Sequence, residues 1–282
     1  MQLNPGQVAV ITGAASGIGL ALAHAAADRG LKLVLADIDE PALDDATANL
    51  LAAGADAIAV PTDVREGPAV AALRDAALSA FGAVHLVCNN AGVAASGRTW
   101  EVEPEVWRWI LDVDLWSVIH GVRTFVPVLL EQGEGHVVNT ASIAGLITVA
   151  GLGPYAVAKH GVVALSETLH SELAATPIGV SVLCPGFVRT RIHEVDRLAP
   201  DEVRAAQPGR GIDETLGRSA FHDLIENGLD PAEVATAVME AVQADRLHIL
   251  VPPEIVAFAT DRLQRIIDSP ADPPAGPEED RQ

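Results

Sequence analysis

Short apolar runs alternate with longer amphipathic stretches along almost the whole chain. Residues 8–11 form the first run, and a glycine-rich turn and a helical stretch at 19–29 follow it. A second run at 31–36 precedes helix-like sequence at 41–53. Runs of this kind, rich in β-branched residues or leucine and flanked by turn residues, predict strands separated by helices.

Five further runs continue the same rhythm. They cover residues 57–61, 86–88, 136–139, 180–183 and 248–251. Because these strands are continuously apolar rather than alternating, they are typical of a parallel sheet covered on both faces. The alternation of seven strands with helices predicts an α/β fold, a doubly wound and mostly parallel sheet with helices on both faces.

Two segments interrupt this rhythm. Residues 190–229 carry charges, glycines and no predicted strand, which is long for a connection inside a compact domain, so we expect a substrate lid or a mobile loop. Residues 268–282 contain four prolines and five acidic residues, and we expect a disordered tail. The remaining residues, 1–267, are expected to form a single domain.

The turn after the first strand has the spacing of a dinucleotide-binding loop. Gly13 permits a tight turn, Gly17 lets the backbone approach a pyrophosphate, and Gly19 lets helix and strand pack closely. The helix that starts here offers amide donors and the positive end of its dipole. A glycine-rich loop without a ligand is the alternative, but the position between strand and helix disfavours it. Ser16 and Ile18 belong to the same predicted site.

Acidic residues follow the second and third strands. Asp37 lies 24 residues after Gly13, where a carboxylate accepts hydrogen bonds from the adenosine ribose and repels the 2′-phosphate of NADP. No lysine or arginine follows it closely, which favours NAD. The alternative is a solvated aspartate that caps the next helix, and Asp63 has a similar alternative. We place Asp63 and Val64 at the cofactor as well.

Tyr155, the only tyrosine, precedes Lys159 by one helical turn. An ammonium about 4 Å from a phenol favours the phenolate by about 4 kcal/mol at an effective dielectric of about 20. Desolvation opposes this, and we expect a net lowering of the Tyr155 pKa that suits a general acid/base. The alternative is an exposed pair on a helix. Ser142, which follows the strand at 136–139, points into the ligand crevice or is an ordinary turn serine.

Taken together, these motifs resemble the short-chain dehydrogenase/reductase family. The similarity covers about residues 6–255, and the motifs occur in family order and spacing. Their spacing fits the smaller alcohol and carbonyl oxidoreductases better than the sugar-nucleotide epimerases and dehydratases. The matching residues are Thr12-Gly13, Gly17-Ile18-Gly19, Asn89-Asn90-Ala91-Gly92, Ser142, Tyr155 with Lys159, and Pro185-Gly186 with Thr190.

The resemblance implies a Rossmann-like sheet, a nicotinamide cofactor and often a homotetramer. It implies that Ser142 hydrogen-bonds the substrate oxygen, that Tyr155 transfers its proton, and that Lys159 binds the nicotinamide ribose and lowers the pKa of Tyr155. Where the family usually has an asparagine thought to hold a relay water, this chain has Asp114. A carboxylate accepts hydrogen bonds but does not donate as an amide does. Further implied cofactor contacts are Asn89, Asn90, Pro185, Gly186, Val188 and Thr190.

Composition narrows the function classes. The chain has 282 residues and 38 acidic against 18 basic side chains, net −20, which argues against nucleic acid and anionic membranes as partners. Cys88 and Cys184 fit no metal or redox spacing, so we expect no metal and a reduced, cytoplasmic protein. No apolar run reaches the length of a membrane span and no signal peptide is visible.

Some side chains have a weaker signal. His193 and His222 are possible pocket members only because they lie in the expected lid. Trp109 and Trp116, seven residues apart, are expected on one helical face and in packing rather than ligand stacking. Arg189 and Arg191 flank Thr190 and are more simply explained as solvated charges than as anion ligands.

The sequence therefore predicts an NAD(H)-dependent oxidoreductase that interconverts a secondary alcohol and a ketone, acting as a homo-oligomer (tetramer or dimer) on a small molecule. Val93, Ala144, Leu152 and Phe187 are expected to line an apolar pocket for an uncharged substrate. The alternative is a catalytically silent dinucleotide-binding sensor or scaffold.

Overall fold

A computed structural model describes residues 1–192, 194–206 and 223–269 of the chain. It contains a seven-stranded sheet in the order β3-β2-β1-β4-β5-β6-β7, and every neighbouring pair is parallel. The predicted fold class and all seven predicted strands are confirmed, with ends that differ by a few residues. The strands are β1 (Val8–Thr12), β2 (Lys32–Asp37), β3 (Ala57–Pro61), β4 (Leu86–Asn89), β5 (Gly135–Thr140), β6 (Ile178–Pro185) and β7 (His248–Val251).

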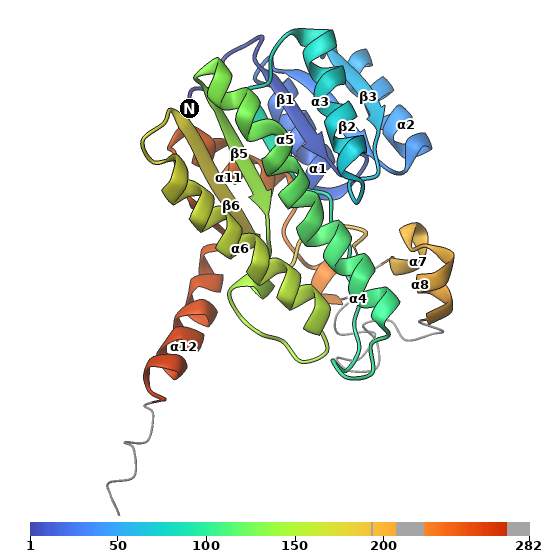
Figure 1. Cartoon of the computed structure of the whole chain (residues 1–282), viewed down its shortest axis with the longest axis vertical. Coiled ribbons are helices and arrows are strands. Elements are labelled where there is room, and N and C mark those ends of the chain that lie inside the picture. Colours follow the sequence, from blue (N-terminus) through green and yellow to red (C-terminus); the bar gives the residue numbers. More distant parts are fainter. Residues whose placement is uncertain (193, 207–222, 270–282) are drawn as a thin grey trace, which may run out of the picture.

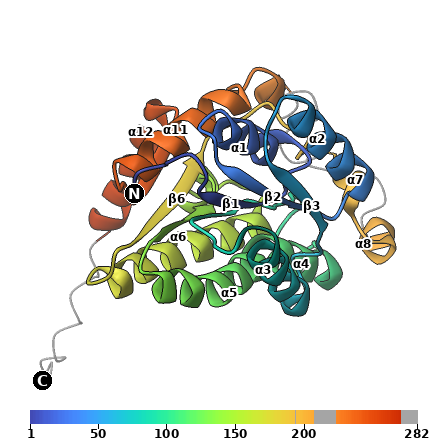
Figure 2. The ribbon, with the colours of Figure 1, turned by 90° about the horizontal axis from the view of Figure 1, so that it is seen from above.

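Helices cover both faces of this sheet (Figure 2). One apolar core lies between the sheet and three helices, namely α1 (Gly17–Ala27), α2 (Glu40–Ala52) and α11 (Pro231–Gln243). The second core lies under α3 (Gly67–Phe81), α5 (Ser117–Gln132) and α6 (Gly153–Leu173) on the opposite face. Strands buried between two such layers explain why the runs read as continuously apolar.

The strand order reverses beside β1, because β2 follows on one side of it and β4 on the other. In open α/β sheets the crevice at such a reversal, outside the carboxyl ends of the strands, is the usual ligand site. The ends of β1, β2 and β4 bring Gly13, Asp37 and Asn90 to this crevice.

The segment from 190 to 229 forms no strand in its described part. Its described residues include the short helices α7 (Val195–Leu198) and α8 (Asp201–Ala206), and residues 223–226 are helical as well. A bridge between Val188 and Leu229 closes the base of the segment. His193 and His222 lie outside the described residues. Most of the predicted tail, from residue 270 onward, does so too. The preceding helix α12 (Val256–Ile267) buries none of its residues and extends away from the sheet (Figure 1).

One long helix bears on the expectation that no apolar run reaches the length of a membrane span. Helix α4 (Pro104–Leu111), the π-helical turn η1 (Asp112–Trp116) and α5 run together as one helix, Pro104–Gln132, whose length and apolar composition would allow it to cross a membrane. In the structure 44% of its most apolar window is buried inside the protein. The core helix of a folded domain passes the same test of length and composition, and α5 occupies such a position on the sheet.

Candidate functional site

A cavity of about 480 Å³ lies at the carboxyl ends of the strands. Its walls come from the glycine-rich loop, the ends of β2 to β6, the start of α6 and the segment after β6. It brings together most residues that the sequence analysis singled out: Gly13, Ser16, Gly17, Ile18, Asp37, Asp63, Val64, Asn90, Val93, Ser142, Ala144, Leu152, Tyr155, Lys159, Pro185, Gly186, Phe187, Val188 and Thr190.

Three of the singled-out residues lie behind this wall. Gly19 is packed so tightly that an added Cβ would meet the Gly13 carbonyl oxygen at 2.0 Å. Asn89 is buried within the sheet, where its amide donates to Asn139 Oδ1 at 2.9 Å. Asp114 is fully buried below the floor of the cavity. The structure therefore makes Gly19 and Asn89 supports of the site rather than parts of its surface.

The glycine-rich loop has a backbone that only glycine adopts without strain. Gly13 has φ +66° and Gly17 has φ +54°, both in the left-handed region. A Cβ at Gly13 would lie 2.9 Å from Ala91 Cα, and one at Gly17 would lie 3.1 Å from Thr190 Cγ2. Ser16 is the N-cap of α1, yet its side chain makes no capping hydrogen bond. The first amides of α1 thus remain available to an anion in the cavity.

Asp37 is buried and held in place by backbone amides. Its Oδ2 accepts a hydrogen bond from Ala15 N at 3.0 Å, and its Oδ1 accepts one from Asp39 N at 3.1 Å. The N-cap of α2 is Asp39, whose side chain accepts from Ala42 N. The alternative interpretation, that Asp37 caps this helix, is therefore wrong.

Two arginines that the sequence analysis did not single out line the same end of the cavity. Arg65 binds the Asp63 carboxylate with two nitrogens, at 2.6 Å from Nη2 and 3.0 Å from Nε. Partial burial raises the pKa of Asp63, but the hydrogen bonds from Arg65 outweigh it and hold the pKa below its usual value. Arg197, from α7, contacts Asp39. Both guanidiniums are thus already engaged by carboxylates.

Lys159 is buried and Tyr155 is half-buried on the first turns of α6, so the alternative of an exposed helical pair is wrong. Lys159 Nζ lies 5.5 Å from the centre of the Tyr155 ring and donates to the Thr140 carbonyl at 3.2 Å. Ser142 is hydrogen-bonded to Tyr155, and its hydroxyl also accepts from Ala144 N at 3.1 Å. A hydroxyl, a phenol and an ammonium therefore meet at one end of the cavity.

The expected net lowering of the Tyr155 pKa is not what the structure shows. Burial raises the pKa of Tyr155 and outweighs the opposing effect of the Lys159 ammonium. The nearby Asp114 carboxylate raises it further, while the hydrogen bond with Ser142 lowers it. The spacing of Tyr155 and Lys159 shows neither how far the fold excludes water from the phenol nor that Asp114 lies nearby.

Asp114 is completely buried on the π-helical turn η1. Its Oδ1 accepts a hydrogen bond from Val93 N at 2.8 Å, and its Oδ2 lies 3.5 Å from Lys159 Nζ. Burial raises the pKa of Asp114, against the attraction of Lys159. A π-helical turn places one extra residue in the helix and is frequent at functional sites.

The same turn separates two tryptophans that were expected on one helical face. Trp109 is 5% exposed and lines the cavity, whereas Trp116 is 49% exposed and lies against His120. The wider turn between them shifts the helical phase, so the expectation of a shared face is wrong. The sequence analysis placed Trp109 in packing and did not predict that it lines the cavity.

The substrate end of the cavity is lined mainly by apolar side chains. Val93 and Phe187 line the cavity as expected, and Ile192, Leu198 and Leu224, from the segment after β6, line it too. These three residues line the cavity because the segment after β6 passes over it, which the sequence does not show. Arg189 and Arg191 are 55% exposed and paired with Asp230 and Glu194, as expected of surface charges, but Arg191 also lines the cavity.

Comparison with known proteins identifies the class. Residues 7–200 match the family model for short chain dehydrogenases, and the chain belongs to the short-chain dehydrogenase/reductase family. Members of this family are NAD(P)-dependent oxidoreductases that act on CH–OH groups. The comparison thus confirms the family and the enzyme class that the motifs indicated.

Individual relatives show how far this similarity extends. A short-chain dehydrogenase/reductase from Burkholderia phymatum, solved in complex with NAD, is 45% identical with a TM-score of 0.89, covering 97% of this chain and 99% of that one. The 1-deoxy-11-beta-hydroxypentalenate dehydrogenase of Streptomyces exfoliatus is 35% identical over 97% of this chain and 93% of its own length. The cyclohexanol dehydrogenase of an Acinetobacter strain is 36% identical over 70% of this chain and 84% of its own length.

Proposed function

We propose that this chain is an NAD(H)-dependent oxidoreductase that interconverts a secondary alcohol and a ketone on a small, uncharged, hydrophobic substrate by hydride transfer. The observation that carries the proposal is one continuous cavity with two unlike ends. One end holds the glycine-rich loop and Asp37, and the other holds Ser142 and Tyr155 among apolar side chains.

The residues at the first end fit a nicotinamide dinucleotide. The uncapped start of α1 and the left-handed glycines Gly13 and Gly17 suit a pyrophosphate, and the fixed Asp37 carboxylate suits the two hydroxyls of the adenosine ribose. When bound, the cofactor supplies the hydride acceptor or donor. Asp63, Val64, Asn90, Pro185, Gly186, Val188 and Thr190 complete this binding surface in the proposal, with Asn89 behind it.

The second end supplies acid and base. Ser142 holds the substrate oxygen by a hydrogen bond, and Tyr155 takes the hydroxyl proton during oxidation or returns it during reduction. Lys159 stabilises the Tyr155 phenolate through its charge and contacts the nicotinamide ribose. For oxidation, the alcohol loses a hydride from carbon and a proton from oxygen, and the proton goes to the phenolate oxygen.

The substrate is proposed from the wall of this end. Val93, Ala144, Leu152, Phe187 and Trp109 present mostly apolar surface, which favours an uncharged, hydrophobic molecule. The cyclohexanol dehydrogenase among the relatives supports this choice, because cyclohexanol is an uncharged alcohol on a hydrocarbon ring. We propose that the segment 190–229 acts as the substrate lid of a domain formed by residues 1–267.

We also propose a homo-oligomer, a tetramer or dimer, in the cytoplasm. Trp116, Leu130 and Val157 are between 43% and 52% exposed on η1, α5 and α6, and such apolar surface supports association. Cys88 and Cys184 are both free, which supports a reducing compartment. Light scattering of the purified chain measures the oligomeric state.

The test of the proposed function is a panel of cyclic and aromatic secondary alcohols assayed with NAD and with NADP. We expect turnover of apolar alcohols and at least a tenfold preference for NAD in kcat/KM, equal to about 1.4 kcal/mol. Carboxylated analogues of the same alcohols serve as controls and are expected to react poorly. Equal efficiency with both cofactors would contradict the NAD preference, and binding of NADH without turnover of any alcohol would favour the silent sensor.

A further inference from the structure

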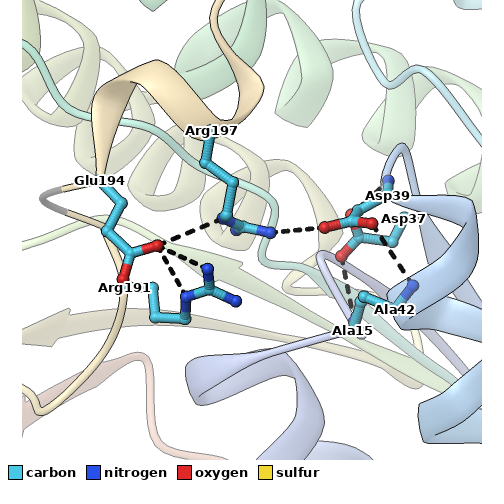
Figure 3. A network of polar contacts seen from close by, with 7 residues as sticks. All are labelled: Ala15, Asp37, Asp39, Ala42, Arg191, Glu194 and Arg197. Carbon is cyan, nitrogen blue, oxygen red and sulfur yellow. Dashed lines mark hydrogen bonds and ion pairs between the residues drawn. The ribbon is translucent and has the colours of Figure 1, made fainter.

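An ion pair joins the segment after β6 to the loop after β2, across the adenosine side of the cavity (Figure 3). Arg197 Nη1 on α7 donates to Asp39 Oδ2 at 2.7 Å, although the two residues are 158 positions apart in the chain. Both side chains are largely buried, with 21% and 24% exposure. Partial burial makes this contact stronger than the exposed pairs elsewhere on the surface.

Asp39 is fixed in position by its own backbone contacts. It caps α2 through Ala42 N, and its amide donates to the Asp37 carboxylate at 3.1 Å. Figure 3 shows the two carboxylates side by side, with Arg197 reaching toward them from α7. Since Asp37 and Arg197 line the same cavity, the guanidinium lies beside the carboxylate that the proposed function assigns to the adenosine ribose.

Arg197 keeps hydrogen-bond donors that its contact with Asp39 through Nη1 does not use. Its Nε is buried without a hydrogen-bond partner in the part of the chain that the structure describes, and it lies 3.9 Å from Glu194 Oε2. A guanidinium binds a phosphate group well because it offers two parallel donors and a fixed charge. Arg197 has the chemistry to bind a 2′-phosphate, but the ion pair with Asp39 offsets its charge and holds it in place.

We propose that Asp39 is a cofactor-specificity residue that acts by holding Arg197 and so withholds a guanidinium from the 2′-phosphate of NADP. The proposal rests on the proposed function and deepens it. Asp37 opposes NADP directly by its charge, whereas Asp39 acts through its partner. Arg65 is a second arginine at the same end. Its Nε and Nη2 bind the Asp63 carboxylate, so its guanidinium is paired as well.

Asp39→Asn separates this role from the structural one. Asparagine is as good an N-cap as aspartate, so α2 keeps its cap while the ion pair with Arg197 loses its charge. Asp39→Ser, another good N-cap, gives a second variant with the same loss. Arg197→Gln removes the guanidinium, and the double variant Asp39→Asn/Arg197→Gln removes both partners.

The experiment titrates parent and variants with NADH and with NADPH, followed by nucleotide fluorescence, and takes the ratio of the two Kd values. In Asp39→Asn we expect the ratio Kd(NADPH)/Kd(NADH) to fall at least tenfold. In the double variant the ratio is expected to stay within about threefold of that in Arg197→Gln. Asp39→Ser is expected to behave as Asp39→Asn does.

Two results would overturn the proposal. An unchanged ratio in both Asp39 variants would show that Arg197 does not reach the phosphate. A tenfold fall that persists in the double variant would show that Asp39 acts by its own charge and not through Arg197. A parent that binds both cofactors equally contradicts the proposed NAD preference, yet the comparison of variants still measures the coupling of Asp39 to Arg197.

Discussion

Replacing Asp114 with asparagine is expected to move the pH dependence of alcohol oxidation toward lower pH. The Asp114 carboxylate lies 3.5 Å from Lys159 Nζ in a buried environment. At an effective dielectric of about 20, the attraction between two unit charges at this separation is about 5 kcal/mol. Because Lys159 would otherwise be a buried charge next to a neutral acid, we expect Asp114 to be ionised under assay conditions above neutral pH.

The sign follows from what Lys159 does to Tyr155. Lys159 lowers the pKa of Tyr155 and Asp114 raises it, so removing the Asp114 charge lowers the pKa of the phenol. Oxidation requires the phenolate, and the variant therefore reaches its maximal rate at lower pH. If the repulsion between the Asp114 carboxylate and the Tyr155 phenolate is about 1.4 kcal/mol, the shift is about one pH unit. Asparagine still offers an oxygen to Val93 N, so the helix should keep its packing.

The assay is a profile of kcat/KM against pH for parent and Asp114→Asn. Asp112→Asn, which removes an equal charge from the same helical turn without touching Lys159, is the matched control and is expected to leave the profile in place. A profile for Asp114→Asn that coincides with the parent would refute the reasoning, because it would mean that Asp114 is neutral. A large loss of activity at every pH would assign the carboxylate a further role.

Three other outcomes follow from the structure. Burial lowers the pKa of His136 from 6.5 to about 4, so stability that is present above pH 6.5 is lost as the pH falls toward 4. Urea unfolding should show that the free energy of unfolding falls by about 2 kcal/mol between pH 7 and pH 5, and that His136→Gln largely removes this fall. An equal fall in parent and variant would contradict the prediction. Gly19→Ala should abolish NADH binding in fluorescence titrations and lower Tm, because its Cβ would meet the Gly13 carbonyl oxygen at 2.0 Å; normal binding would count against the close-packed loop. Deleting residues 269–282, a proline-rich acidic stretch, should change Tm by less than about two degrees, and a larger drop would show that it packs.

The sequence predicted the features that depend on short, local patterns. Seven strands, the glycine-rich turn and the spacing of Tyr155 and Lys159 are each legible within a few residues, and the parallel sheet then gathers them at one edge. The pairing of Arg197 with Asp39 was not predictable, because it depends on the path of a segment 158 residues away. The π-helical turn has no clear sequence signal, and it decides where Trp109 and Asp114 point.

The direction of the Tyr155 pKa shift in the buried site could not be predicted from the sequence either. A lysine one turn from a tyrosine indicates a lowered pKa, but the sign depends on how much water the site excludes and on which other charges face it. Here burial and Asp114 together outweigh Lys159, and the pKa of Tyr155 is raised. Both contributions arise from the fold and not from the spacing of the two residues.

The central claim is that this chain is an oxidoreductase that uses Tyr155 as its acid and base. The most direct test compares the parent with Tyr155→Phe. The measurement is NADH binding by fluorescence together with NAD-dependent turnover of an apolar secondary alcohol that the parent oxidises. The ring of phenylalanine fills the same space, so we expect NADH to bind with nearly the parent Kd while turnover falls by at least a thousandfold. Turnover within tenfold of the parent would contradict the assignment.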